Sequence, residues 1–485
     1  MSLVDPLSTT ARDLARGLRE REVSAREVVQ AHFDRIDAVN PVLNAVVTEV
    51  REQAMAAAVE TDERTMAAHR FHATGVLPPL HGIPMTHKDT IATEGIRTTM
   101  GSPVYAEHVP GYSDLVIERL QAGGVITTGK TNVPEFGAGS HTFNEVFGAT
   151  GNPWDPRLSA GGSSGGVAAV LAARVQPLGE GSDVGGSLRN PAAFCNVVGF
   201  RPSHGVVPVA PTLHPWAWLP RVGMMARDVA DVALGMSVVS GPDPRVPAPC
   251  PVDPDDFAEL VDEPVPDRPL TGLRIGLTVG FGLGVPVDPE IVAVVLAQAA
   301  VLESLGAEVD EACPDLRWAD EVFDVTRAYD MAARLGDVVE RHRDRVKEEV
   351  VWNVERGLAL TARELISADL ARGRLHRSVG EFFEGYDVLV APVTQVLPFP
   401  VEERWPRVVA GQPMQTYVEW MRSVSLISAT GCPAVSVPAG FTGAGLPVGL
   451  QLVGADGDDV RLLRVAKAYE AATGHGKRLP ELPRG

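Results

Sequence analysis

The chain has 485 residues, is 45% hydrophobic and carries a formal net charge of −19 at pH 7. The length allows two or three domains around a large buried core, whereas the acidic balance argues against nucleic acids and anionic membranes as partners. Four scattered cysteines suggest neither a disulfide framework nor a metal site, and with no secretory leader or membrane-length apolar run we expect a soluble cytoplasmic protein without a cofactor.

The first seventy residues have a helical pattern. Ser24 and Glu27 form a capping-box sequence ahead of apolar residues at helical spacing, and the Asn40-Pro41 step predicts the end of that helix. A short strand is expected within residues 44–50, and an alanine-rich helix within residues 51–70.

Residues 78–89 predict a turn and a short buried strand that ends at Lys88. Lysine is rare in this chain, with five lysines among 43 basic residues. Because arginine fills most basic positions in this chain, a lysine between apolar segments indicates a role that arginine cannot fill. Lysine can lose its proton, whereas arginine cannot. The alternative is an ordinary lysine that reaches solvent from the end of a strand.

Residues 110–122 predict a helix, and residues 124–130 predict a buried strand. The segment Gly124–Thr131 matches the phosphate-binding pattern GxxxxGK[ST] letter for letter. A phosphate loop needs its strand before the first glycine and a helix at the lysine. Here the β-branched residues lie inside the supposed loop and Pro134 follows soon after it, so the context disfavours a nucleotide site.

The stretch from Ser159 to Arg189 contains two glycine-flanked serines, Ser163 and Ser187, on either side of an apolar helix expected over residues 167–174. Glycine lets the backbone approach a ligand closely, so each serine combines an accessible hydroxyl with nearby N–H groups, as acyl transfer requires. Residues 188–194 predict a helix whose first N–H groups point back at the second serine.

The first of these serines also lies in the pattern of a nucleophile elbow, Gly161-x-Ser163-x-Gly165. An elbow follows directly on a strand, and we expect no strand over residues 156–160. No histidine of the chain stands in a recognisable motif either. Both observations disfavour an α/β-hydrolase.

The rest of the chain alternates helices with strands, which indicates an α/β layered fold. A proline-rich loop over residues 208–220 carries Trp216 and Trp218, and residues 241–269 have the composition of a linker or surface excursion. The other predicted elements are helices over 227–239, 289–383 and 461–473, and strands over 273–278, 388–391, 431–438 and 449–453.

Several of these segments resemble the amidase signature family. The resemblance is carried by Lys88-Asp89, by Gly129–Asn132 with Glu135-Phe136, and by the serine blocks 161–166 and 181–189, and it continues through 152–156, 223–227, 387–392, 431–434 and 446–451. It implies one α/β/α domain over residues 1–485, built on a large, mostly parallel, mixed sheet, with residues 1–70 as a helical segment packed on it.

The resemblance also implies a Ser–cis-Ser–Lys triad. Ser187 would be the nucleophile, Ser163 the bridging serine on a cis peptide and Lys88 the base. The expected oxyanion hole consists of the N–H groups of Val184, Gly185, Gly186 and Ser187, and the expected supporting residues are Ser164, Asp183 and Arg189.

Lys88 can act as a base only when it is neutral. Burial and a shortage of nearby acids would favour the neutral form by lowering its pKa. Asp89 would oppose this if it faced Lys88, but successive residues of a strand point to opposite faces, so we expect Asp89 to point away.

Four residues are candidates for the substrate pocket. Gly137 and Ala138 fall where members of the family line the acyl site, and their small size would leave room there. Trp216 and Trp218 would wall an apolar or aromatic acyl pocket, unless they serve as ordinary core or surface packing. Whether their loop is a lid stays open.

The expected function is hydrolysis of the C–N bond of a linear carboxamide through a Ser187 acyl-enzyme, giving a carboxylic acid and ammonia or an amine. The alternatives are the glutaminase subunit of a tRNA-dependent amidotransferase, or an ester, carbamate or cyclic-amide hydrolase with the same triad. A non-catalytic binding protein is disfavoured because the triad is intact. We expect a small-molecule amide as ligand, no metal, no nucleic acid and no membrane, with a homodimer left open.

Overall fold

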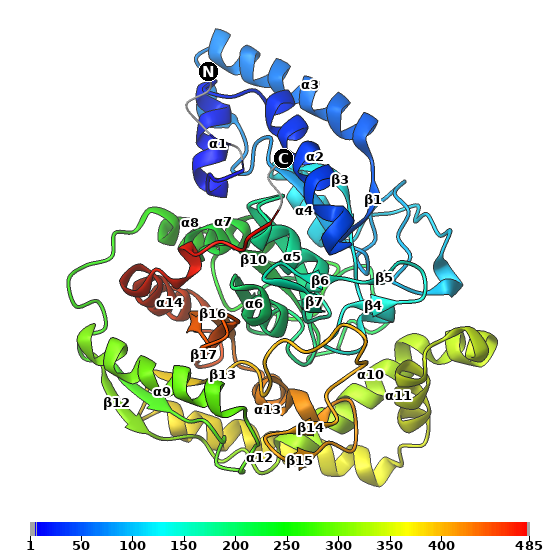
Figure 1. Cartoon of the computed structure of the whole chain (residues 1–485), viewed down its shortest axis with the longest axis vertical. Helices are drawn as coiled ribbons and strands as arrows, with labels where there is room; N and C mark the ends of the chain where they lie inside the picture. The colour runs from blue at the N-terminus through cyan, green and yellow to red at the C-terminus, as the bar shows by residue number, and fades with distance from the viewer. Residues whose placement is uncertain (1–4, 6, 483–485) are drawn as a thin grey trace.

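A mixed β-sheet forms the centre of the computed structural model, which describes Asp5 and residues 7–482 (Figure 1). Its eight strands lie in the order β12 (Glu308–Glu311), β11 (Arg274–Leu277), β13 (Val388–Pro392), β17 (Pro447–Val453), β16 (Ala434–Phe441), β9 (Val198–Arg201), β10 (Arg221–Ala226) and β8 (Leu178–Asp183). The predicted mixed sheet is confirmed. Five of the seven neighbouring pairs among these described strands are antiparallel, however, so parallel pairing is the minority and not the majority that the resemblance implied. One reason is the short β16–β17 connection, which permits only an antiparallel pair.

A second, smaller sheet carries the lysine-bearing strand. Its order is β1 (Val46–Glu49), β3 (Ile126–Thr131) and β2 (Pro84–Lys88), and β2 runs parallel to β3. All residues of β2 are buried. The backbone N–H of Lys88 donates to Glu180 Oε1 of β8 at 2.8 Å, so the end of β2 lies where the small sheet meets the large one. The remaining strands form two-stranded ribbons: β4 (Phe143–Asn144) with β5 (Gly148–Ala149), β6 (Gly151–Asn152) with β7 (Asp155–Ser159), and β14 (Val408–Val409) with β15 (Gln412–Pro413).

The N-terminal helices pack around the small sheet at the top of Figure 1. They are α1 (Ala11–Glu20), α2 (Ala25–Leu43), α3 (Arg51–Arg70) and α4 (Leu115–Ala122). The capping box predicted at Ser24 is confirmed. The predicted end of the same helix at Pro41 is wrong, because α2 continues through that residue to Leu43 and ends at Asn44, which has a left-handed conformation. A proline this close to the C-terminus removes only one intrahelical bond, which α2 tolerates.

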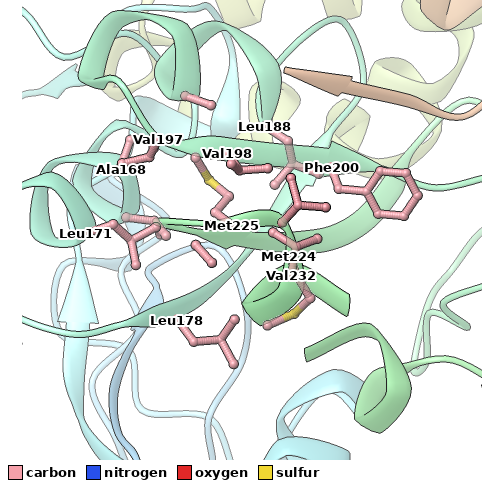
Figure 2. Packing of buried hydrophobic residues seen from close by; sticks show 14 of the residues in the cluster. Ala168, Leu171, Leu178, Leu188, Val197, Val198, Phe200, Met224, Met225 and Val232 are labelled. Atoms are coloured by element: carbon pink, nitrogen blue, oxygen red, sulfur yellow. The ribbon is translucent and has the colours of Figure 1, made fainter. Parts of the chain in front are cut away.

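Helix α5 (Gly165–Ala172) lies in the apolar centre of the molecule. Every one of its residues is buried. Figure 2 shows Ala168 and Leu171 of α5 in one cluster with Val198 of β9 and Met225 of β10. Because α5 is enclosed on all sides, the Ser163-Ser164 segment at its N-terminus is held in a fixed position. The neighbouring helices are α6 (Arg189–Cys195), α7 (Val229–Val239) and α14 (Asp459–Thr473).

The segment 241–269 contains a helix that its composition did not predict. Helix α8 (Pro254–Asp262) packs against α7 and buries Phe257 and Leu260 completely. This part of the segment is therefore docked on the core. The predicted helical block 289–383 is interrupted by β12, an edge strand with one apolar residue among three acidic ones. It divides into α9 (Pro289–Ser304), α10 (Ala319–His342), α11 (Glu348–Leu358) and α12 (Ala362–Phe383), with α13 (Arg422–Thr430) beyond them.

Candidate active site

Strand β2 delivers Lys88 into a buried cluster of serine hydroxyls. The side chain is fully buried, so the alternative of a solvent-exposed lysine is wrong. Its Nζ lies within hydrogen-bond distance of three hydroxyls: Ser163 Oγ at 2.8 Å, Ser164 Oγ at 2.9 Å and Ser182 Oγ at 2.9 Å. A lysine whose close partners are hydroxyls and not carboxylates can exchange protons with them.

Burial dominates the protonation of Lys88. It lowers the pKa of the side chain to about 7, against the smaller raising effects of the charges on Asp183 and Glu180. The expected shortage of nearby acids is therefore wrong, since two carboxylates act on the lysine, but burial outweighs them. Asp89 points away as predicted, because its Oδ2 accepts from Thr99 Oγ1 at 2.5 Å.

The bridging-serine loop has the backbone that the resemblance implies. The Gly162–Ser163 peptide bond is cis. The carbonyl of Gly162 accepts from Ser140 Oγ at 2.9 Å, and that hydroxyl accepts from Asn190 Nδ2 at 2.8 Å. Gly161 has a φ of +76°, and a Cβ there would lie 2.8 Å from Pro191 Cα. The loop is therefore fixed from both sides, and glycine is required at this close approach.

The expectation that no strand precedes this loop is wrong. Strand β7 ends at Ser159, and α5 begins at Gly165, so Ser163 does lie between a strand and a helix. However, β7 pairs with β6 in a ribbon outside the large sheet, whereas an elbow serine follows a strand of the central sheet. The partner of Ser163 is a lysine, which also differs from the histidine of an α/β-hydrolase.

Ser187 lies in the loop between β8 and α6, beside the bridging serine. The N–H of Ser164 donates to the carbonyl oxygen of Ser187 at 3.2 Å, which joins the two serine loops. Ser187 keeps 9% of its surface exposed, compared with 2% for Ser163 and 0% for Lys88. Of the three side chains, it is therefore the one that a substrate can reach.

Asp183 organises the loop that carries Ser187. Its carboxylate accepts from the N–H groups of Gly186 at 2.9 Å and Leu188 at 3.1 Å, and from Arg189 Nη2 at 3.0 Å. Burial opposes the charge on Asp183, but Arg189 and Arg201 outweigh it and hold the pKa of the carboxyl well below its usual range. The N–H of Gly186 is committed to this carboxylate, so it is not available for the oxyanion hole predicted to include it.

A serine–serine–lysine cluster of this kind, joined to two glycine-rich loops, is what the amidase resemblance requires. The family model described as Amidase matches residues 27–463. The chain belongs to the amidase signature family. Membership establishes the fold and an amidohydrolase activity.

Members of the family with different activities are similar to this chain. It is 34% identical to a glutamyl-tRNA(Gln) amidotransferase subunit from Heliobacterium modesticaldum, with 98% of each chain covered. It is also 34% identical to an acylamidase of Rhodococcus erythropolis, over 95% of each chain. A solved bacterial aryl acylamidase of the family superposes with a TM-score of 0.86 at 28% identity, over 96% of each chain.

The structure separates the four residues expected in the substrate pocket into two groups. Gly137 faces the cluster, since a Cβ there would lie 3.5 Å from Ser163 Oγ, and Ala138 follows it as a buried residue. Trp216 and Trp218 line a separate cavity of about 210 Å³ that includes no residue of the triad. Trp216 is 72% exposed, whereas Trp218 packs against the same apolar cluster as Val184 and Phe323.

Two apolar side chains that the sequence did not point to lie against the loop that carries Ser187. A Cβ on Gly185 would lie 2.6 Å from Phe323 Cζ of α10, and a Cβ on Gly186 would lie 2.4 Å from Val424 Cγ2 of α13. Both side chains therefore rest directly on the Ser187 loop. They come from a part of the chain that carries no motif, so only the tertiary structure identifies them.

Ser182 is a third residue that sequence reasoning missed, although it contacts Lys88 as closely as Ser164 does. The signal was the alternation along β8, which directs Glu180 and Ser182 to the same face. The segment was not predicted as a strand, because glycines and charged residues make up most of it.

Neither a phosphate loop nor a metal cluster is found in the described part of the chain. Strand β3 runs through the supposed phosphate loop, as its composition predicted, and Lys130 Nζ donates to the carbonyl of Ile91 at 2.5 Å. Across Asp5 and residues 7–482, no group of three or more His, Cys, Asp or Glu side chains is placed to hold a metal ion. Within the same residues, no helix has the length and apolar character needed to cross a membrane.

Proposed function

We propose that this amidohydrolase cleaves the C–N bond of a linear carboxamide through an acyl-enzyme on Ser187. The observation that carries the proposal is the contact of Lys88 Nζ with Ser163 Oγ at 2.8 Å, together with the backbone hydrogen bond that joins the next residue, Ser164, to the more exposed Ser187. A base, a bridging hydroxyl and a reachable hydroxyl are the parts that nucleophilic acyl transfer requires.

In the proposed reaction, neutral Lys88 takes the proton of Ser163, which takes the proton of Ser187. The freed Ser187 Oγ bonds to the amide carbonyl carbon, whose oxygen becomes the oxyanion. When the C–N bond breaks, Ser163 returns a proton to the nitrogen, so ammonia or an amine leaves. Water then attacks the ester carbon, passes its proton along the same route, and releases the carboxylic acid and Ser187.

The oxyanion lies, in this proposal, against the N–H groups of Val184, Gly185 and Ser187, each worth about 3–4 kcal/mol to the transition state. Asp183 and Arg189 brace the loop, and Ser164 supports Lys88. Phe323 and Val424 supply an apolar surface beside the loop, which supports a preference for an apolar or aromatic acyl group. The similarity to acylamidases points the same way.

A second candidate is the glutaminase subunit of a tRNA-dependent amidotransferase. It is favoured by the relatives named as subunits of a glutamyl-tRNA(Gln) amidotransferase, one of which covers 98% of this chain. The same triad serves both candidates, and they differ in the need for a partner. A simple amidase turns over alone, whereas the subunit reaction requires a partner enzyme and a charged tRNA.

Labelling with a fluorophosphonate, without any partner, followed by peptide mass mapping, tests the proposal. We expect an adduct on Ser187 that is lost in Ser187→Ala and retained in the matched control Ser237→Ala, a partly buried serine on α7 whose hydroxyl donates to Leu234 O. An amide panel centred on aromatic acyl groups should then release ammonia or amine, and EDTA should not inhibit. Turnover of glutamine only after a partner is added would instead establish the second candidate.

A further inference from the structure

A buried carboxylate lies directly behind the lysine of the proposed triad. Glu180 of β8 is fully buried, and so is its neighbour His87 of β2. One carboxylate oxygen, Oε1, accepts from the backbone N–H of Lys88 at 2.8 Å. The other, Oε2, lies 3.1 Å from His87 Nδ1. Glu180 thus binds two successive residues at the end of β2 from the neighbouring sheet.

The imidazole of His87 extends this contact to a third strand. Its Nε2 lies 2.9 Å from Thr127 Oγ1 of β3, and that hydroxyl accepts from Gln121 Nε2 at 3.2 Å. A single assignment satisfies every group: Thr127 donates to Nε2, and His87 Nδ1–H donates to the carboxylate. Both carboxylate oxygens of Glu180 therefore have a neutral donor.

Asp183 is the other carboxylate whose charge raises the pKa of Lys88, but it forms ion pairs with Arg189 and Arg201, and Asp89 is turned toward Thr99. Among the elements packed against β2, α5 carries no titratable side chain, and α2 contributes His32, whose Nδ1 lies 2.8 Å from Val175 O. Lys130 of β3 is a buried cation whose pKa is lowered by burial, and the charges of Asp89 and Glu180 oppose that effect.

We propose that Glu180, supported by His87, is a positioning residue for Lys88: it ties the end of β2 to β8 and places a carboxylate directly behind the lysine. Asp183 and Glu180 together oppose the effect of burial on the pKa of Lys88, so the loss of Glu180 would make the lysine a weaker base. The carboxylate therefore helps to set the pH at which the base becomes available. The inference rests on the proposed role of Lys88 as the base.

The test is the pH dependence of fluorophosphonate labelling at Ser187, which requires no knowledge of the amide. Labelling of the wild type should rise with pH through about 7, where burial places the pKa of Lys88. We call the rise of labelling with pH the rising limb of the profile. In Glu180→Gln, which keeps the acceptor for the Lys88 N–H, we expect this limb to move to lower pH by about one unit, because the variant loses a nearby opposite charge. A limb that stays in place, or moves to higher pH, overturns the inference.

Glu135→Gln is the matched control. Glu135 is 2% exposed, and its oxygens likewise accept a backbone N–H, from Lys347 at 2.8 Å, and a side-chain donor, from Ser102 at 2.6 Å. It does not contact Lys88, so its limb should coincide with that of the wild type. A merely structural effect of losing a buried carboxylate would instead move both limbs or neither.

A second pair of variants keeps the inference testable if Glu180→Gln does not fold. His87→Leu removes the donor to Glu180 Oε2 and favours the protonated, uncharged carboxyl, so the limb should move to lower pH. His87→Gln restores a donor, and its limb should return toward that of the wild type. Identical limbs in both variants overturn the inference. Absence of labelling in the wild type itself would contradict the proposed function instead.

Discussion

Two lysines on neighbouring strands are buried to the same degree but have different partners. Lys88 of β2 and Lys130 of β3 both have no exposed surface, and burial lowers the pKa to about 7 for the first and about 8 for the second. In the register of the two strands, His87 lies opposite Lys130, so the two lysines project from opposite faces of the small sheet.

The difference between the two sites lies in what the ammonium groups touch. Lys88 Nζ faces three hydroxyls, whereas Lys130 Nζ donates to the carbonyl of Ile91 and to Thr93 Oγ1 at 3.0 Å. The single hydroxyl beside Lys130 donates in turn to the same carbonyl, that of Ile91, at 3.4 Å, and a carbonyl oxygen has no proton to pass on, so Lys130 fixes the chain after β2. The three hydroxyls beside Lys88 can both receive and donate a proton, and one of them belongs to the proposed bridging serine, so Lys88 can do chemistry. Burial alone therefore does not identify a base.

The largest expected effect separates the two lysines. Lys88→Met should lower the rate constant of turnover by at least about 10³-fold, since it removes the base, while the melting temperature changes little. Lys130→Met should keep the activity per folded molecule but lower the free energy of unfolding by about 1–3 kcal/mol, because it leaves Ile91 O and Thr93 without their donor. Activity assays and thermal melts of both variants check this. Equal loss of activity in the two variants would contradict the distinction between a catalytic and a structural lysine.

The hydroxyls around Lys88 should differ in a similar way. Ser163→Ala should also lower the rate constant of turnover by at least about 10³-fold, because it interrupts the proton route. Ser182→Ala removes one hydrogen bond to Nζ, worth about 0.5–1.5 kcal/mol, so we expect a loss of about 2- to 12-fold. Single-turnover rates of the acylation step measure both. If the Ser182 variant were as inactive as the Ser163 variant, the proton route would need to include Ser182.

The most gradual expected effect concerns the dependence of stability on pH. Between about 7 and the ordinary value of 10.5, folded Lys88 binds fewer protons than unfolded Lys88, so its contribution to stability should rise with pH by at most about 1.4 kcal/mol per unit. Below about 7 both forms are charged and the contribution is constant. Urea unfolding of the wild type and Lys88→Met over this pH range measures the difference. A parallel course of the two curves would show that the lysine stays charged in the fold.

The sequence predicted the candidate catalytic residues better than the strands around them. Lys88, Ser163 and Ser187 could be proposed because glycine-flanked serines and a rare lysine are local signals, and because the resemblance to the amidase signature family implies their roles. The strands β8, β9 and β10 were not predicted, since Leu178–Asp183 and its neighbours contain many glycines and few β-branched residues, and their pairing depends on the sheet. Glu180 gave no signal, because its role depends on partners 92 and 93 residues away.

The same reasoning explains the errors at single positions. Gly186 was assigned to the oxyanion hole because nothing in the sequence shows that Asp183 folds back on its N–H. Trp216 and Trp218 were proposed for the substrate pocket because they are large and apolar, whereas the structure shows both beside a separate cavity and Phe323 and Val424 against the Ser187 loop. A contact over three residues decided the first case, and contacts between distant segments decided the second.

The position of Phe323 and Val424 has a consequence for how this enzyme can be altered. Lys88, both serines and Asp183 all precede residue 190, whereas the two apolar side chains over their loop come from α10 and α13, far along the chain. The proposed triad and the apolar surface over its loop are thus encoded in separate stretches. Recombination between relatives, with a crossover after residue 227, would exchange Phe323 and Val424 while leaving the proposed triad, Gly137 and Ala138 unchanged, and this division makes the scaffold suited to diversification by shuffling.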